Sequence, residues 1–375
     1  MTSRERIEAA LNHKEPDRTP IFEYVLLSPV ADSLLGRRYA ADPRNWNDLL
    51  AEKGWEAAVR QCALDQLELA ALLGHDMLYA IPNPLPSTQP QDNAPDIDSR
   101  FDDPVERIRR RNERDAQTDS TPDETLLVYV YLKEYMRKRG PDLPILAPAY
   151  SHGVWTDTDL MQTMLLAPEV AQEHFTIATR DTLTRIEKYI ALDIDQIGIG
   201  GDFSGTRPLI SPEAYRAFIV PHVRTLSRRI HASKRYAVNA SDGNLWPVID
   251  DFLFGCEVDG YLEIDLHAGM DLRRLKQICR GRVTLYGNLD CGNILSFGSV
   301  EDVRQHTIAC LEAGMGNGGH ILCASNAITE SIPLQNYVAV VNAYREVFNL
   351  PRFGGSSSSP PSLPSPRMER GKEYR

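Results

Sequence analysis

The sequence predicts an α/β protein built as a (β/α)₈ TIM barrel, and three observations support this fold class. Eight short apolar or β-branched segments alternate with amphipathic stretches of helical period. The short segments are apolar almost throughout, as expected for strands that are covered on both faces. No GxGxxG motif begins a helix after an early strand, which disfavours an open dinucleotide-binding sheet. Covered parallel strands with helices between them are typical of a closed barrel.

The strands are expected over eight segments, which are 20–25, 76–81, 144–149, 195–201, 235–241, 258–264, 283–289 and 318–324. Several helices have recognisable start signals. Ser3 precedes an amphipathic run that predicts an N-terminal helical extension. Proline occupies the first helical position in the helices predicted over 168–190 and, after Ser211, over 211–231. Ser299 is the expected N-cap of a helix that ends at Gly314.

Two regions interrupt this rhythm. Residues 82–125 are rich in Pro, Asp, Arg and Ser, and we interpret them as an insertion after the second strand with a charged helix near 104–113. Loops at the carboxyl ends of barrel strands build the active site, so the insertion is expected there, either as a lid or as a solvated excursion. Residues 351–375 are rich in Ser and Pro and predict a disordered tail, which leaves 1–350 for the barrel.

The composition excludes several functional classes. The chain of 375 residues is 42% hydrophobic and 25% charged, which is ordinary for a protein with a sizeable core. Its formal net charge of −11 argues against nucleic acid or an anionic membrane as a partner. Six cysteines without a CxxC pair indicate reduced thiols. The charged start and the lack of a long apolar run predict a cytoplasmic protein without a signal peptide.

Polar residues at the ends of barrel strands are the candidates for chemistry. We expect the carboxyl groups of Asp202, Asp242 and Glu263 to be catalytic. Glu263 follows apolar residues and would be costly to bury ionised, so it is either hydrogen-bonded or poised for acid–base work. Asp242 begins a DGN sequence that equally suits a structural turn, and Asp202 follows a glycine-rich run that suits either ligand approach or packing.

Other polar or aromatic residues at the same rim are candidate substrate-binding residues. His152 is either a proton donor or a hydrogen-bonded structural residue, and Cys323 is expected to be a buried core thiol. The substrate-binding candidates are Glu23, Tyr24, His152, Phe203, Asn239, Ser241, Asn244, Asn288, Asp290, Ser325 and Asn326.

Several sequence blocks together resemble the uroporphyrinogen decarboxylase superfamily, which includes the cobamide-dependent methyltransferases. The resemblance extends over residues 3–348 and implies a barrel with an open cleft for a small or tetrapyrrole-like ligand. The blocks are RERIEAALNHKEPDRTP, DQIGIGGDFSGTRPLISPEAYRAFIVPH, SDGNLWPVID, GMDLRRLKQICRGRVTLYGNLD, and GGHILCASNAI followed by IPLQN.

The resemblance disfavours the haem-pathway reaction for this chain. Decarboxylases of the superfamily carry an RQAGRY segment after the first strand, where arginines meet the substrate's carboxylates. The corresponding stretch here is EYVLLSPVADSLLGRRYA, with Glu23 and Tyr24 in place of the arginine. A polycarboxylate would meet the wrong sign of charge at this point.

The methyltransferase branch holds zinc through a His-x-Cys motif after the fifth strand and a cysteine after the eighth. The matching positions here are Asn239, Ser241 and Asn326, which lack the imidazole and thiolate that zinc favours. Cys323 lies three residues before the third position. We therefore predict no zinc site and no tightly bound cofactor.

The resemblance implies a methyltransferase that moves a methyl group between a corrinoid and a small acceptor or donor. A corrin is large and flat, so it would approach the open barrel on a separate carrier protein. Two alternatives stay open. One is a lyase that decarboxylates a porphyrinogen or another carboxylated substrate, and the other is a family member that binds a ligand without catalysis.

Overall fold

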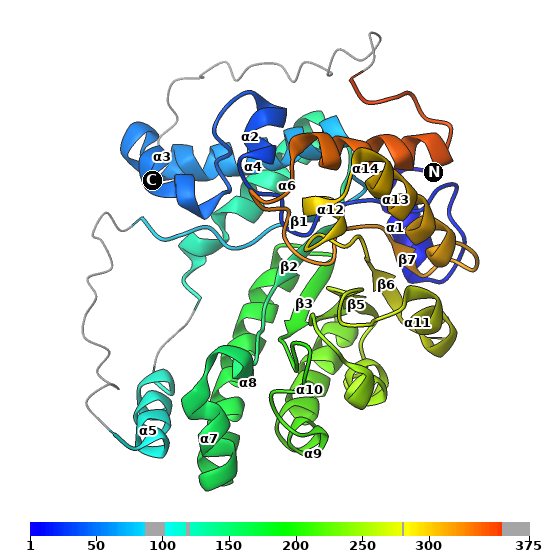
Figure 1. Cartoon of the computed structure of the whole chain (residues 1–375). Coiled ribbons are helices and arrows are strands. Elements are labelled where there is room, and N and C mark those ends of the chain that lie inside the picture. Colours follow the sequence, from blue (N-terminus) through cyan, green and yellow to red (C-terminus); the bar gives the residue numbers. More distant parts are fainter. Residues whose placement is uncertain (87–101, 118–120, 280, 355–375) are drawn as a thin grey trace.

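The computed structural model describes residues 1–86, 102–117, 121–279 and 281–354, and the strands in these ranges form one parallel sheet in chain order (Figure 1). Each strand is short and is hydrogen-bonded to the next one along the chain. The strands are β1 (Leu78–Tyr79), β2 (Ile145–Pro148), β3 (Gln196–Gly200), β4 (Tyr236–Ala240), β5 (Gly260–Leu262), β6 (Thr284–Tyr286) and β7 (His320–Ile321).

The first predicted strand, 20–25, is present as a bridged segment rather than as a regular strand. Ile21 pairs in parallel with Leu322, just after β7. The N–H of Phe22 donates to the carbonyl of Leu322 at 3.1 Å, and the N–H of Asp76 donates to the carbonyl of Ile21 at 2.7 Å. The segment therefore lies between β7 and β1 and closes the curved sheet. Each of the other predicted strands is confirmed, although most are shorter than expected.

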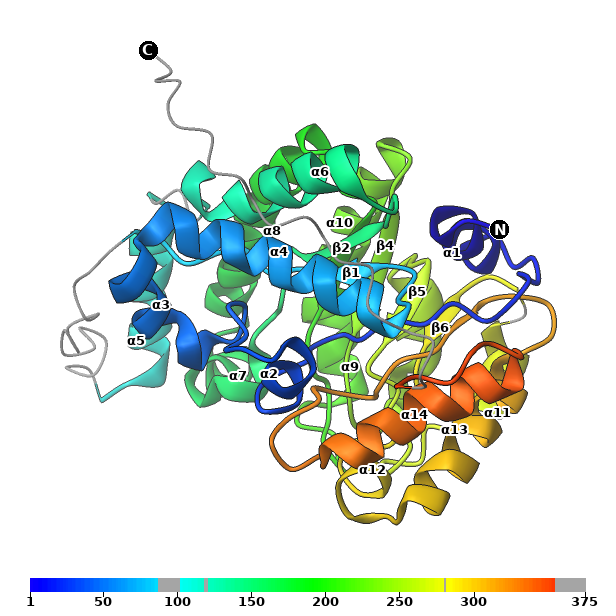
Figure 2. The same cartoon turned by 90° about the horizontal axis from the view of Figure 1, so that it is seen from above.

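Helices cover the outside of the curved sheet, as the view from above shows (Figure 2). The helix bounds are α1 (Ser3–Leu11), α2 (Val30–Leu35), α3 (Trp46–Lys53), α4 (Trp55–Leu73), α5 (Pro104–Asp115), α6 (Leu127–Arg139), α7 (Thr158–Leu166), α8 (Pro168–Ala191), α9 (Pro212–Ala214), α10 (Val220–Ala232), α11 (Leu272–Cys279), α12 (Ile294–Phe297), α13 (Val300–Gly314) and α14 (Leu334–Val347). No helix in the described ranges is both long enough and apolar enough to cross a membrane.

The helix start signals are mostly confirmed. Ser211 caps the helical stretch that begins at α9, and a π-helical turn joins α9 to α10. Ser299 caps α13 in a capping box with Asp302. The prediction for α1 is wrong by one residue, because the hydroxyl of Thr2, rather than that of Ser3, accepts the N–H of Glu5.

The described part of the predicted insertion packs against the outer helices. Arg107 of α5 pairs with Asp159 of α7 at 2.6 Å, and Asn112 donates to the carbonyl of Val170 in α8 at 3.1 Å. Figure 1 shows α5 beside α7 and α8, near the end of the barrel toward which the strands run. Residues 87–101 and most of the predicted tail, 355–375, lie outside the described residues.

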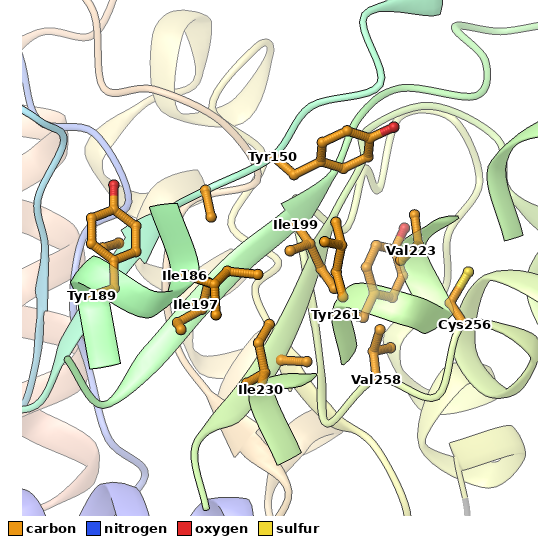
Figure 3. Packing of buried hydrophobic residues seen from close by; sticks show 14 of the residues in the cluster. Tyr150, Ile186, Tyr189, Ile197, Ile199, Val223, Ile230, Cys256, Val258 and Tyr261 are labelled. Carbon is orange, nitrogen blue, oxygen red and sulfur yellow. The ribbon is translucent and has the colours of Figure 1, made fainter. Parts of the chain in front are cut away.

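The core has an outer and an inner layer because successive strand residues point to opposite faces. In the outer layer, Ile197 and Ile199 of β3 lie among side chains of α8 and α10, including Ile186 and Ile230 (Figure 3). The inner layer fills the barrel with side chains from successive strands, including Phe22, Met77, Leu146, Val238, Leu262, Tyr286 and Ile321. All six cysteines are free thiols, as predicted.

A buried ion-pair network fastens the amino-terminal end of the barrel. Asp76 is fully buried just before β1, and its carboxylate accepts hydrogen bonds from Arg6 at 2.6 Å and Arg18 at 3.0 Å. The same carboxylate accepts the N–H of Ile21 at 3.1 Å. This one side chain therefore joins α1, the closing segment and β1.

We expect Asp76→Asn to lower the free energy of unfolding by about 2 to 3 kcal/mol, because it removes a fully buried carboxylate that pairs with Arg6 and Arg18 and leaves the more exposed Asp17 as the counter-charge of Arg6. Urea denaturation followed by circular dichroism measures the change. Asp142→Asn is the matched control, since Asp142 is an exposed partner of Arg4 and its loss should cost less than about 1 kcal/mol. Equal losses in the two variants would contradict this role for Asp76.

Candidate active site

Three carboxyl groups meet at the carboxyl ends of the neighbouring strands β3, β4 and β5. Asp202 and Asp242 each follow their strand by two residues, and Glu263 follows β5 directly. The N–H of Asp242 donates to Oδ1 of Asp202 at 3.1 Å. Asn326, after β7, donates its side-chain amide to Oδ2 of Asp242 at 3.1 Å. The structure thus brings together the three predicted catalytic residues and Asn326, a predicted binding residue, and we call these four residues the carboxyl cluster.

Glycines allow the two loops that carry the aspartates to approach each other. Gly200 has a φ of +136°, and a Cβ atom there would lie 2.2 Å from Oδ1 of Asn239. Gly243 has a φ of +75°, as its place in the DGN turn predicts, and a Cβ atom would lie 1.9 Å from the carbonyl oxygen of Ser204. Any larger residue at either position would push the loops apart.

Glu263 has a backbone conformation that is unusual for a residue other than glycine. Its φ is +72°, in the left-handed region, where strain of order 1–3 kcal/mol is tolerated mainly at functional sites. In β5, Tyr261 belongs to the outer layer and Leu262 to the inner layer, so regular alternation would turn Glu263 outward. The left-handed backbone breaks this alternation, and the Glu263 carboxyl group instead hydrogen-bonds with Tyr24 of the inner layer.

Burial raises the pKa values of all three carboxyl groups, and nearby negative charges raise those of Glu263 and Asp242 further. Burial and the charges of Asp202 and Asp242 raise the pKa of Glu263 to about 8. Burial and the charges of Asp202 and Asp265 raise the pKa of Asp242 to about 6, against the opposing effect of the Asn326 hydrogen bond. Burial also raises the pKa of Asp202. At neutral pH the cluster therefore holds a mostly protonated Glu263 beside a mostly ionised Asp242, which are an acid and a base in one site.

Three further residues belong to this site, and none of them is among the catalytic and substrate-binding residues predicted from the sequence. Asp265 follows Glu263 by two residues, accepts the N–H of Ala268 at 3.1 Å, and adds negative charge near Asp242. Tyr79 of β1 packs edge-on against Tyr24, with ring centroids 4.6 Å apart. The buried hydroxyl of Tyr261 makes no hydrogen bond within the described ranges. Asp265 could have been predicted from its position at the end of a strand. Tyr79 and Tyr261 could not, because a tyrosine within a strand resembles any other core residue.

Three predicted binding residues support the loops of the cluster. The ring of His152 donates from Nε2 to the carbonyl of Gly201 at 2.8 Å and accepts the N–H of Val154 at Nδ1. Burial lowers the pKa of His152 to about 4, so the ring is neutral at neutral pH. The hydroxyl of Ser241 accepts the N–H of Phe203 at 3.3 Å, while the Phe203 ring packs edge-on against Tyr215 in the core.

The remaining predicted binding residues bond to the scaffold, and the structure does not bring them to the carboxyl cluster. Their partners are backbone groups or neighbouring side chains. Asn239 donates to the carbonyl of Phe252, Asn244 accepts the N–H of Trp246, Asn288 donates to the carbonyl of Met270, Asp290 accepts the N–H of Asn293, Ser325 contacts Cys291, and Glu23 accepts the N–H of Ala324.

The residues at the zinc positions of the methyltransferase branch do not fit that metal. Asn239 is fully buried and directs its amide nitrogen to the Phe252 carbonyl, away from the cluster. Ser241 and Asn326 offer a hydroxyl and an amide that already bond to neighbouring groups. No group of three or more His, Cys, Asp or Glu side chains within the described ranges is arranged to hold a metal ion. Neutral amides and a hydroxyl are poor zinc ligands compared with thiolate and imidazole.

Comparison with known proteins gives a consistent set of similarities. A curated methylated-thiol–coenzyme M methyltransferase from Methanosarcina mazei is 26% identical over 199 residues, which cover 53% of this chain and 48% of the relative. The match thus spans about half the length of that relative. A solved methyltransferase from Methanosarcina mazei superposes with a TM-score of 0.66 at 19% identity and covers 93% of this chain and 99% of that chain. This likeness confirms the barrel fold.

A family model supplies the assignment. The model described as uroporphyrinogen decarboxylase (URO-D) matches residues 152–347, just over half of the chain. The matched region contains β3 to β7 and the three catalytic candidates. The chain belongs to the uroporphyrinogen decarboxylase family.

Proposed function

We propose that this chain is a methyltransferase that moves a methyl group between a corrinoid on a separate carrier protein and a small acceptor or donor, with a thiol as the first acceptor to test. The observation that carries the proposal is the geometry at the mouth of the barrel, where Asp242 donates its N–H to Asp202 and accepts the amide of Asn326, beside Glu263. Burial and neighbouring charges raise the pKa of Asp242 to about 6 and that of Glu263 to about 8, which suits a base beside an acid. The similarity to a relative named for methyl transfer to a thiol coenzyme adds support.

The side chains would handle the protons of the acceptor. When the methyl group moves to a thiol, the S–CH₃ bond forms, the methyl–cobalt bond breaks with its electron pair left on cobalt, and the S–H proton must leave. The Asp242 carboxylate accepts that proton, while Asn326 fixes the orientation of the carboxylate. Protonated Glu263, held by Tyr24, donates a hydrogen bond to the bound acceptor or protonates the donor in the reverse direction.

The same cluster disfavours the alternative of a polycarboxylate decarboxylase. Burial and the charges of Asp202 and Asp242 already raise the pKa of Glu263, and burial and the charge of Asp202 raise that of Asp242. Further carboxylates from a porphyrinogen would add to that repulsion. Glu23, which we expected to repel such a substrate, accepts the N–H of Ala324 instead. The unfavourable charge therefore comes from the carboxyl cluster, whereas we had expected it from the segment after the first strand.

Asp242→Asn should lower the rate of methyl transfer by at least about a hundredfold, because the acceptor proton loses its base. The measurement is an anaerobic assay with methylcob(III)alamin and a panel of thiols and tetrahydrofolate, followed by the visible absorbance of the methyl–cobalt bond. Asp250→Asn is the matched control, since Asp250 is exposed near the same loop. If the absorbance of the methyl–cobalt bond does not change when acceptor is added to folded wild-type protein, methyl transfer from the free corrinoid is contradicted. A wild type that binds its ligand without any turnover would support the non-catalytic alternative.

The pH dependence of kcat/KM should be bell-shaped, with limbs near pH 6 and pH 8. The rate rises as Asp242 ionises through its pKa of about 6 and falls as Glu263 loses its proton through its pKa of about 8. Glu263→Gln keeps a hydrogen-bond donor but cannot ionise, so its profile should lose the alkaline limb. An alkaline limb that persists unchanged in this variant would assign it to another group.

A further inference from the structure

A second pocket lies in the barrel wall beside the carboxyl cluster. It is lined by residues 23–27, by α4 and by β1, and it has a volume of about 80 Å³. Next to it, the N–H of Asp76 donates to the carbonyl of Ile21 and so joins the closing segment to β1. Tyr24 and Tyr79 both line the pocket, and Tyr24 also bonds to Glu263. The tyrosine pair therefore stands between the pocket and the cluster.

Two buried polar atoms line this pocket without a hydrogen-bond partner in the described structure. They are Oε1 of Gln66, on α4, and Nε2 of His75, between α4 and β1. Gln66 is only 9% exposed. A buried polar atom without a partner costs about 1–3 kcal/mol, and native proteins leave few such atoms. Two in one pocket indicate that a polar ligand atom is expected there.

The lining also determines the charge of the ligand. The residues that line the pocket include no lysine or arginine, and burial lowers the pKa of His75 to about 3, so its ring is neutral. A carboxylate, phosphate or sulfonate would therefore find no counter-charge. Most of the wall is apolar and includes Leu69, Met77 and Ile81. These features favour a neutral and mostly alkyl molecule.

The size of the pocket suits a ligand of a few heavy atoms. The volume of about 80 Å³ is several times the roughly 10–15 Å³ that one water molecule needs on the same measure. The oxygen of Gln66 can only accept, whereas the neutral ring nitrogen of His75 either accepts or donates. A hydroxyl suits both atoms and leaves the rest of the molecule alkyl, whereas an amide would bring additional polar atoms into an apolar wall.

We propose that this pocket binds a neutral short-chain alcohol whose hydroxyl donates to Oε1 of Gln66, with the alkyl chain against the apolar wall and Tyr79. The pocket adjoins the carboxyl cluster, with Tyr24 and Tyr79 between the two, and the proposal holds whether or not the chain transfers methyl groups. Its test is therefore a binding measurement.

Two isomers of the same formula distinguish the contribution of the hydroxyl to binding from that of the alkyl chain. We expect 1-propanol to bind the full-length protein about fivefold more tightly than ethyl methyl ether, which lacks the donor, as measured by titration with saturation-transfer NMR. Gln66→Leu should remove this preference because the acceptor is lost. Gln305→Leu, at an exposed glutamine of α13, should keep it. Propionate, the anionic comparison, should not bind at this site.

Several results would overturn the proposal. These are equal affinities of the two isomers for the wild type, a preference that survives in Gln66→Leu, tight binding of propionate, or no saturable binding of 1-propanol to the folded protein. If Gln66→Leu does not fold by circular dichroism, Ala41→Leu replaces it. Ala41 is only partly buried at the edge of the pocket, so a larger side chain there should fill the pocket and abolish propanol binding.

Discussion

The burial of three carboxyl groups close together is the constraint on which the chemistry of this site depends. Burial raises the pKa values of Asp202, Asp242 and Glu263, and the charges of Asp202 and Asp242 raise the pKa of Glu263 further. Such a cluster is unfavourable unless protons, hydrogen bonds or a ligand offset the charge. Here Asn326 bonds to Asp242, Tyr24 bonds to Glu263, and Glu263 keeps its own proton at neutral pH.

The closing segment connects this cluster to the opposite end of the barrel. Near the amino-terminal end of this segment (residues 20–25), Ile21 and the ion pairs of Asp76 join it to β1 and α1. Near its carboxyl-terminal end, Glu23 accepts hydrogen bonds from the N–H of Ala324 and from the hydroxyl of Tyr337. Tyr24 hydrogen-bonds with Glu263. Burial raises the pKa of Glu23 to about 8. The four residues from 21 to 24 thus close the sheet and deliver one side chain to the site.

The sequence predicted the barrel and the strand ends well because both depend on local signals. Apolar runs located the strands, glycines located the loops at Gly200 and Gly243, and polar residues after the strands located Asp202, Asp242 and Asn326. The direction of individual side chains was harder to predict. Asn239 follows the regular alternation of β4 and turns outward to Phe252, while Glu263 leaves the alternation of β5 through its left-handed backbone.

Other features could not be predicted because they depend on contacts between distant segments. The contact between the rings of Tyr24 and Tyr79 joins the closing segment to β1. The polar atoms of Gln66 and His75 that lack hydrogen-bond partners line the same pocket only once α4 has packed on the sheet. The resemblance located the zinc positions of the family, and the structure adds the physical reason that they do not fit zinc. The amide nitrogens of Asn239 and Asn326 already donate to partners of their own.

The protonation state of Glu263 tests the central claim most directly. Infrared difference spectroscopy of the wild type against Glu263→Gln detects the carbonyl stretch of a protonated carboxyl group without any substrate. We expect this band to be present at neutral pH, to be lost as the pH rises through about 8, and to be absent from the variant. A Glu263 that is already ionised below pH 6 would contradict the proposed pairing of an acid with a base at the mouth of the barrel.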